Sequence, residues 1–114
     1  MLERVLILDS DIHVRDFLYE LLSEVGFGVL TMPTGQEVLE RLKKERPALI
    51  IIDDATGEFS GIELVKKIRE FDKDIKIIML GQEPEIQALD PSLKETNVSA
   101  YLKKDFQNSD IIKN

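Results

Sequence analysis

The chain has 114 residues, with 15 basic and 22 acidic side chains, no cysteine and one histidine, and its length fits one domain over residues 1–114. The formal net charge of -7 argues against binding to nucleic acid or to an anionic membrane surface, because both need clustered Lys and Arg. A chain without cysteine has no disulfide or zinc thiolate site, and because it also lacks a membrane-length apolar run and a signal-peptide pattern, we expect a soluble, cytoplasmic protein.

Apolar runs of strand length recur along the chain and predict five strands. The runs are 5–8, 27–31, 48–52, 75–80 and 98–102. The third run is continuously apolar instead of alternating, which is typical of a parallel strand covered on both faces. It is therefore expected at the centre of the sheet.

The segment between the first two runs has the periodicity of a helix. Asp11 is placed to cap its N-terminus and Gly26 to end it. Apolar residues recur at steps of three and one, which predicts one buried face. The residues of this face are Val14, Phe17, Leu18, Leu21, Leu22 and Val25.

Two further helices are predicted by capping-box patterns, in which a hydroxyl residue precedes a Glu by three positions. The second helix begins at Thr34 and ends before Pro47, and the third begins at Ser60. The residues expected to point inward are Val38, Leu39 and Leu42 in the second helix, and Leu64, Val65, Ile68 and Phe71 in the third.

The last third of the chain is less regular. Pro84 and Pro91 bracket the first half of the fourth connection, where a short helix is expected at 90–95. A short last helix is expected at 108–113. The segments share no repeated consensus, so a leucine-rich solenoid is set aside.

Strands that alternate with helices predict an α/β protein with an open, doubly wound parallel sheet of flavodoxin-like type. Among five-stranded sheets of this type, the order 2-1-3-4-5 is the common one. It places the topological switch point between the ends of the first and third strands. A functional site is expected there.

Acidic residues follow the two strands that meet at this point. The first strand ends in Asp9-Ser10-Asp11 and the third in Asp53-Asp54, so four carboxylates are expected in one crevice. Clustered oxygen ligands suit Mg²⁺, which would also offset repulsion between the carboxylates. A divalent-cation site follows from this arrangement.

The fifth strand brings Lys103 and Lys104 to the same edge of the sheet. An ammonium group there could pair with a carboxylate or with a phosphoryl oxygen. Acids, a metal ion and a lysine together favour phosphoryl chemistry, in which a carboxylate acts as nucleophile and forms an acyl phosphate.

Plainer roles exist for some of these acids. Asp11 is expected to cap its helix in any case, and Asp54 is expected to be a solvated loop acid. Asp9 and Asp53 close buried runs at the switch point, which favours a functional role for both.

These features together resemble the receiver domain of two-component response regulators. The motifs that carry the resemblance are Val-Leu-Ile-Leu-Asp-Ser-Asp at 5–11, Pro-Ala-Leu-Ile-Ile-Ile-Asp at 47–53, Ser-Gly at 60–61 and Tyr-Leu-Lys-Lys at 101–104. The resemblance spans 4–106. Each motif is short, but their order and spacing together are specific.

The resemblance implies a role for each matching residue. Asp53 would be phosphorylated by a histidine kinase, and Lys104 would contact the phosphoryl group. Mg²⁺ would be held by Asp9, Asp53 and the main-chain carbonyl of Ala55, and Asp11 is a further candidate ligand. No other cofactor is implied.

The chain departs from the family's pattern at several positions, among them Asp105 and the loop with Gly57 and Glu58, where the family usually has a proline, and two departures bear directly on the site. Ser10 stands where the family has a second acid, so we expect weaker Mg²⁺ binding than a complete acidic triad would give. Gly81 stands where the family has a Ser or Thr switch that hydrogen-bonds the phosphoryl group, so the signalling rearrangement is expected to be reduced. Tyr101 matches the aromatic residue that moves with the switch.

The implied function is phosphorelay signal transduction by a phosphoprotein that is not an enzyme. The alternative is a pseudo-receiver that binds partner proteins without being phosphorylated. The implied partners are a histidine kinase and a downstream output domain or protein, and a homodimer through helix 4, strand 5 and helix 5 is a candidate assembly. Both an excised domain of a longer regulator and a stand-alone protein are compatible with the sequence.

Two unrelated functions are disfavoured. A flavodoxin-type cofactor domain needs a Gly/Ser/Thr-rich phosphate cradle after the first strand, where this chain has acids, and the nucleotide motifs G-x-x-x-x-G-K and G-x-G-x-x-G are absent. A hydrolase would need a general base beside the acids. The only histidine, His13, is expected at the start of the first helix, facing solvent.

Overall fold

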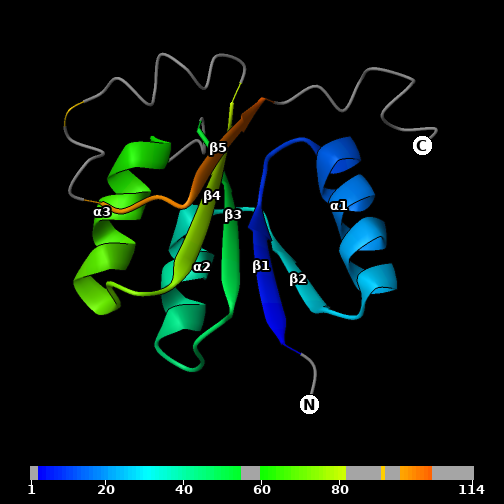
Figure 1. Ribbon diagram of the computed structural model, residues 1–114, viewed down its shortest axis with the longest axis horizontal. Helices are drawn as coiled ribbons and strands as arrows, with labels where there is room; N and C mark the ends of the chain where they lie inside the picture. The colour runs from blue at the N-terminus through cyan, green and yellow to red at the C-terminus, as the bar shows by residue number, and fades with distance from the viewer. Residues whose placement is uncertain (1–2, 55–59, 82–90, 92–95, 104–114) are drawn as a thin grey trace.

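The computed structural model describes residues 3–54, 60–81, 91 and 96–103. The described residues form a five-stranded parallel sheet with the order β2-β1-β3-β4-β5 (Figure 1). The strands are β1 (Arg4–Leu8), β2 (Gly28–Met32), β3 (Leu49–Asp53), β4 (Lys76–Gly81) and β5 (Ala100–Lys103). The five predicted strands, their order and the flavodoxin-like fold class are confirmed, with strand bounds shifted by one or two residues.

The central strand is β3, as its continuous apolar run predicted. It lies between β1 and β4, and four of its five residues are buried. The register aligns Leu8 of β1 with Ile52 of β3, and Asp53 of β3 with Leu80 of β4. The carboxyl ends of β1, β3 and β4 therefore meet at one edge of the sheet.

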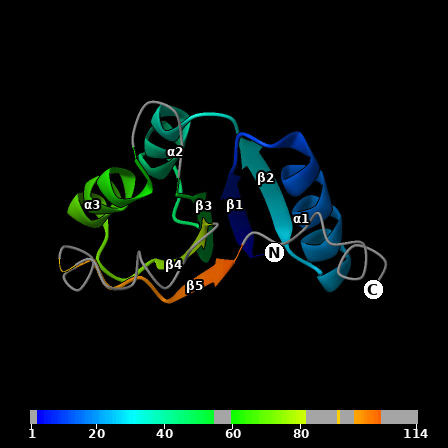
Figure 2. The same cartoon turned by 90° about the horizontal axis from the view of Figure 1, so that it is seen from above.

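Helices cover both faces of the sheet. The described helices are α1 (Ile12–Val25), α2 (Gly35–Leu42) and α3 (Gly61–Phe71). α2 and α3 lie on one side of the sheet and α1 lies on the other (Figures 1 and 2). Among the described residues, no helix is long and apolar enough to cross a membrane.

The predicted helix caps are confirmed. The side chains of Asp11, Thr34 and Ser60 accept hydrogen bonds from backbone amides in the first turns of α1, α2 and α3. Gly26 ends α1 with a φ of 113°, a left-handed conformation that glycine adopts without the steric penalty of a Cβ atom.

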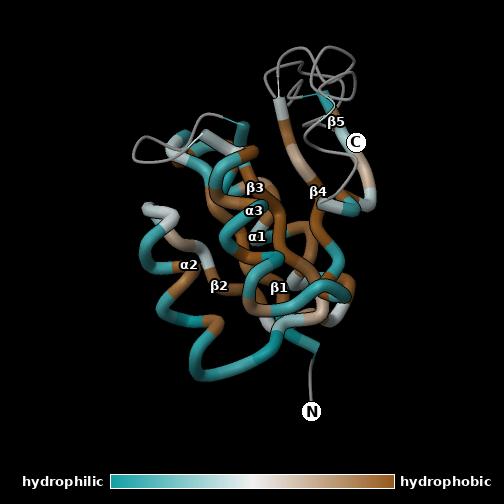
Figure 3. Tube along the Cα trace, turned by 90° about the vertical axis from the view of Figure 1, so that its left-hand side faces the viewer, coloured by the Kyte–Doolittle hydropathy of each residue, from teal (hydrophilic) through white to brown (hydrophobic). Residues whose placement is uncertain are grey.

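The sheet separates two apolar clusters, because side chains alternate between its faces. Leu6 and Leu8 of β1 pack in the cluster beneath α2 and α3, whereas Val5 and Ile7 pack beneath α1 with Val14 and Leu18. Figure 3 shows the apolar segments gathered along the central strands.

Three residues predicted to be buried are exposed, and all lie toward the end of a helix. Leu21 and Val25 of α1 are 46% and 67% exposed, and Phe71, the last residue of α3, is 51% exposed. Periodicity identifies the face of a helix that points inward, but not how far along the helix its neighbours extend. The helices expected at 90–95 and 108–113 lie outside the described residues, apart from Pro91.

Candidate functional site

Two buried acids follow the ends of neighbouring strands. Asp9 comes directly after β1 and is 0% exposed, and Asp53 ends β3 and is 3% exposed. The strand register pairs the residues just before them, Leu8 and Ile52, so the two acids occupy equivalent positions at the switch point between β1 and β3. The structure thus brings together the pair of acids for which the sequence favoured a functional role.

Asp11, the acid that follows Asp9 most closely, is directed at its own helix. Oδ1 of Asp9 accepts a hydrogen bond from the amide of Asp11 at 2.9 Å, which holds the turn between β1 and α1. Oδ1 of Asp11 in turn accepts one from the amide of His13, also at 2.9 Å. Asp11 therefore caps α1 as predicted, and the exposed Ser10 lies between the two acids.

On the other side of the pair, the start of α3 packs closely against the end of β3. The amide of Gly61 donates to the carbonyl oxygen of Asp54 at 2.8 Å, and the amide of Asp54 donates to that of Leu80 at 2.8 Å. A Cβ atom on Gly61 would lie 2.8 Å from Cα of Asp54 and 2.7 Å from Cε of Met79. Only glycine fits here without movement of the strand end.

The sequence did not predict this role of Gly61. The Ser-Gly pair at 60–61 was recognised as part of a family motif and as a helix cap, but not as a point of close approach. One signal for this role is in the sequence. Gly61 comes directly after a helix cap, where most residues would suit the first turn of a helix, so a glycine there points to a steric reason for having no side chain. The structure shows that the glycine sets the spacing between α3 and the strand that carries Asp53.

The acids at this edge form a pair and not a larger cluster. Within the part of the chain that the structure describes, no three His, Cys, Asp or Glu side chains lie close enough to hold a metal ion together. The expectation that four carboxylates share one crevice is therefore corrected, because Asp11 caps its own helix. Two carboxylates still match the usual Mg²⁺ site, which takes one or two from the protein and fills the rest with water and phosphate oxygens.

The strands on the far side of β3 carry the remaining candidate residues. Gly81 is buried at the end of β4 and pairs with the exposed Lys103 at the end of β5. Tyr101 is half-buried and packs against the cluster beneath α2 and α3. Ala55 and Lys104 lie outside the described residues.

A broad hollow of about 950 Å³ lies at the opposite edge of the sheet. Its lining includes Arg4, Gly28 and Lys76, which begin β1, β2 and β4. The acidic pair lies at the edge where the strands end, so this hollow is not part of the candidate site.

His13, at the start of α1, is exposed to solvent, as predicted.

The sheet order and the acidic pair at the switch point define a flavodoxin-like, doubly wound α/β protein with an acidic candidate site. A model of the response regulator receiver domain matches residues 5–114. The chain therefore belongs to the receiver domain family of two-component signalling.

Curated relatives of similar length agree with this family. The chain is 28% identical to the sporulation initiation phosphotransferase F of Bacillus subtilis, over 97% of this chain and 89% of the relative. It is 30% identical to the response regulator receiver protein CpdR of Brucella abortus, over 97% of this chain and 92% of the relative. A longer relative, the probable transcriptional regulator ycf27 of Galdieria sulphuraria, is matched over only 30% of its length.

Solved structures show the same fold. The response regulator TrrA of Thermotoga maritima, in complex with Mg²⁺ and BeF, superposes with a TM-score of 0.81 at 31% identity, over 98% of this chain and 94% of that one. The chemotaxis response regulator CheY4 of Vibrio cholerae superposes with a TM-score of 0.83 at 29% identity, over 99% and 94%.

Proposed function

We propose that this chain takes part in a phosphorelay and accepts a phosphoryl group on Asp53 from a histidine kinase, with Mg²⁺ bound at the same site. The observation that carries the proposal is the burial of Asp9 and Asp53 at equivalent positions of neighbouring strands. Two carboxylates that end neighbouring strands are the number that a Mg²⁺ site usually takes from the protein, with water and phosphate oxygens as the other ligands.

The proposed Mg²⁺ ligands are the carboxylates of Asp9 and Asp53 and the main-chain carbonyl of Ala55. Support comes from the pair of buried carboxylates and from the Mg²⁺ complex of the relative TrrA. When bound, the ion would neutralise charge on the incoming phosphoryl oxygens and on the attacking carboxylate. Asp11 is the weaker candidate as a ligand, because its carboxylate caps α1.

In the proposed step, a carboxylate oxygen of Asp53 attacks the phosphorus atom of a phosphohistidine. A bond forms between that oxygen and phosphorus, and the bond between phosphorus and the ring nitrogen breaks. The ring reacts with its other nitrogen protonated, so when the electron pair of the broken bond returns to the first nitrogen the donor leaves as neutral imidazole. The product is an acyl phosphate on Asp53. The chain's own contribution is to hold the carboxylate in place, through β3 and the close packing of Gly61.

The residues that respond to the phosphoryl group complete the proposal. Lys104 follows β5 directly and is proposed to contact a phosphoryl oxygen through its ammonium group. Gly81 offers no hydroxyl at the end of β4, so we propose that the link from phosphorylation to the position of Tyr101 is weakened but not lost. Tyr101 lies on β5 next to Met79 of β4 in the register.

A second candidate function is phosphorylation-independent binding of partner proteins by the same fold. The neutral, exposed Ser10 and the absence of a side chain at Gly81 favour it. Asp53, the expected phosphoacceptor, is nevertheless present and ends β3 beside Asp9 at the switch point, and the first function is preferred on that ground.

The decisive experiment measures whether Asp53 accepts a phosphoryl group. The full chain is incubated with acetyl phosphate and Mg²⁺, and its intact mass is measured. We expect one added phosphoryl group that disappears in Asp53→Asn and remains in Asp54→Asn, the matched control with the neighbouring acid changed. No adduct under conditions that modify an ordinary receiver domain would reject phosphoryl transfer in favour of the pseudo-receiver.

The partners and assembly belong to the proposal as well. Residues 1–114 are taken as one domain working in the cytoplasm with a histidine kinase, and its output lies in a further domain or protein. A homodimer through helix 4, strand 5 and helix 5 stays a prediction. Of that face, β5 lies within the described residues.

A further inference from the structure

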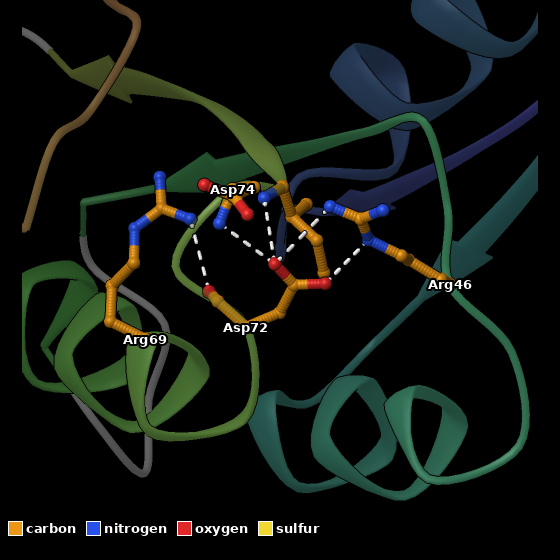
Figure 4. Close-up of polar contacts among 5 residues, drawn as sticks. Arg46, Arg69, Asp72 and Asp74 are labelled. Atoms are coloured by element: carbon orange, nitrogen blue, oxygen red, sulfur yellow. Dashed lines mark hydrogen bonds and ion pairs between the residues drawn. The ribbon is translucent and has the colours of Figure 1, made fainter.

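Arg69, in the last turn of α3, directs its guanidinium group at backbone carbonyls from two different loops. Its Nε donates to the carbonyl oxygen of Thr96, and its Nη2 donates to that of Asn97 at 2.9 Å. Its Nη1 donates to the carbonyl oxygen of Asp72 at 3.2 Å, the contact drawn in Figure 4. One side chain therefore joins the end of α3 to the turn that leads into β5.

The turn of Thr96 and Asn97 depends on contacts with the rest of the protein. Thr96 is 3% exposed, so its carbonyl oxygen has little access to water and depends on a donor from the protein. Asn97 has a φ of 53°, in the left-handed region that residues other than glycine seldom adopt. Beyond the turn, the amide of Ser99 donates to the carbonyl oxygen of Ile77 at 2.8 Å, which begins the pairing with β4.

The strand that follows has little burial of its own. β5 lies at an edge of the sheet, with Ala100 and Tyr101 half-buried and Leu102 and Lys103 exposed. Strand register is strongly specified where one face is buried and weakly where it is not. The partial burial of Ala100 and Tyr101 therefore specifies the position of β5 along β4 only weakly, and the bonds from Arg69 supply a second anchor.

We propose that Arg69 is a positioning residue that fixes the register of β5 by holding the turn of Thr96 and Asn97. Through β5 it sets where Tyr101 and the following Lys104 lie relative to Asp53. The part that concerns Lys104 rests on the proposed function. Because a slip of one residue sends every side chain of a strand to the opposite face, a change of register at the turn would move Tyr101 off the cluster against which it packs and would shift the residue that follows β5.

Arginine suits this task better than lysine. A planar guanidinium group presents donors on three nitrogen atoms in a fixed fork, and each of these nitrogens donates to a different carbonyl oxygen, whereas the donors of an ammonium group all lie on one nitrogen. Burial lowers the pKa of Arg69 below its usual value, and the charges of Asp72 and Asp74 offset only part of this shift, which agrees with a side chain partly withdrawn from water.

Hydrogen exchange on the unphosphorylated full chain tests the proposal without relying on phosphorylation. In Arg69→Met, we expect the amides of Ala100–Lys103 to lose protection by about tenfold or more, while those of β1 and β3 change little. Arg69→Lys keeps the charge and the aliphatic stem, so it is expected to fold and to restore only part of the protection.

Arg46→Met is the matched control. Arg46 pairs with the carboxylate of Asp72 at the same corner of the fold, and its described contacts do not include the turn before β5. Equal loss of protection in β5 for Arg46→Met and Arg69→Met would overturn the proposal, because it would show a general loosening of this corner. Full protection of the β5 amides in Arg69→Lys would overturn the claim that the planar guanidinium group is needed to hold the turn.

A second arm tests the link to the site. Arg69→Met is expected to slow modification of Asp53 by acetyl phosphate severalfold relative to Arg46→Met. An unchanged rate with an unprotected β5 would overturn the link to Lys104 while leaving the anchor intact. Failure of the parent chain to be phosphorylated would reject the proposed function, and the exchange data would still decide the role of Arg69 in the fold.

Discussion

At the scale of single residues, burial separates Asp9 and Asp53 from the other acids of this edge. Both are almost fully buried, whereas Asp11 and Asp54 are half-buried and Ser10 is exposed. Water can therefore solvate the side chains of Ser10, Asp11 and Asp54, but it has little access to those of Asp9 and Asp53. A charge added at position 10 would therefore lie beside the pair without the cost of burying it.

Changing Ser10→Asp should tighten Mg²⁺ binding. An added carboxylate at this exposed position attracts the ion through solvent of high dielectric constant. We expect the dissociation constant to fall by about tenfold, which corresponds to ~1.4 kcal/mol. Isothermal titration of the parent and the variant with MgCl₂ measures it. Ser10→Asn, which is similar in size but neutral, is the control, and equal affinities for Ser10→Asp and Ser10→Asn would refute the electrostatic account.

The close approach at Gly61 gives a second prediction at this scale. In Gly61→Ala the new Cβ atom would lie 2.8 Å from Cα of Asp54, a backbone atom that can move only if the end of β3 moves. Met79, whose Cε lies 2.7 Å away, can rotate and so gives less resistance. We expect a loss of about 1–3 kcal/mol in the free energy of unfolding, the usual cost of overpacking.

Urea unfolding of the parent and Gly61→Ala checks this cost. The midpoint should fall while the slope stays the same, because the surface exposed on unfolding is unchanged. Replacing Met79 with a shorter residue in the Gly61→Ala background should recover little of the loss. Full recovery would show that the side chain of Met79, and not the strand end, opposes the substitution.

At the scale of elements, Asp72 joins the end of α3 to β4 and to the loop before β3. Its Oδ1 accepts from the amides of Asp74 at 2.7 Å and Ile75 at 3.2 Å, and its carboxylate pairs with Arg46 (Figure 4). The hydrogen bond from the Asp74 amide, followed by the bond and charge of Arg46, lowers the pKa of Asp72 below its usual 3.8, and burial opposes the shift.

This lowered pKa makes the contribution of Asp72 dependent on pH. A carboxyl group with a lower pKa in the folded chain stabilises the fold above its unfolded pKa, and the effect is lost as pH falls through the folded value. Asp72→Asn should therefore be less stable than the parent at pH 7, and the difference should shrink as pH falls below 3.8. Urea unfolding of both proteins between pH 3 and pH 7 measures it.

The pairing partner supplies the control for this prediction. In an Arg46→Met background, Asp72→Asn should cost less than it does in the parent, since the ion pair is already lost. The loss in the free energy of unfolding that remains would measure the hydrogen bonds from the amides of Asp74 and Ile75. An identical cost in both backgrounds would show that Arg46 does not contribute to the effect.

At the scale of the whole molecule, the features predictable from the sequence were those set by local patterns. Apolar runs gave the strands, and side chains such as Thr34 and Ser60 marked the helix starts. The positions of Asp9 and Asp53 followed from the sheet order, because parallel strands end at the same edge.

Features that depend on contacts between distant segments were not predictable. The contact of Arg69 with Thr96 and Asn97 joins positions 27 and 28 residues apart and has no local signature. The exposure of Leu21 and Val25 depends on what lies beside the end of α1, and a single helix does not encode it.

Binding at the acidic edge should stabilise the entire fold. Asp9 and Asp53 are 44 positions apart in sequence and adjacent only when β1 and β3 pair, so an unfolded chain presents no such site. A ligand that binds only the folded state adds about 2.7 kcal/mol at a hundredfold excess over its dissociation constant, which raises the melting temperature of a domain of this size by about 10–20 °C. Melting curves over a MgCl₂ titration should show this rise in the parent and in Asp54→Asn.

The rise should be absent in Asp53→Asn. The quantity to compare is the increment that Mg²⁺ produces in each protein and not the melting temperature itself, because removal of one of two neighbouring buried charges can stabilise the fold on its own. Replacing MgCl₂ with NaCl at equal ionic strength separates binding from screening of the net charge of -7. An equal rise in melting temperature with Mg²⁺ in Asp53→Asn and in the parent would show that the ion binds elsewhere and that Asp53 is not a metal ligand. The role of Asp53 as phosphoacceptor would still be decided by the mass measurement with acetyl phosphate.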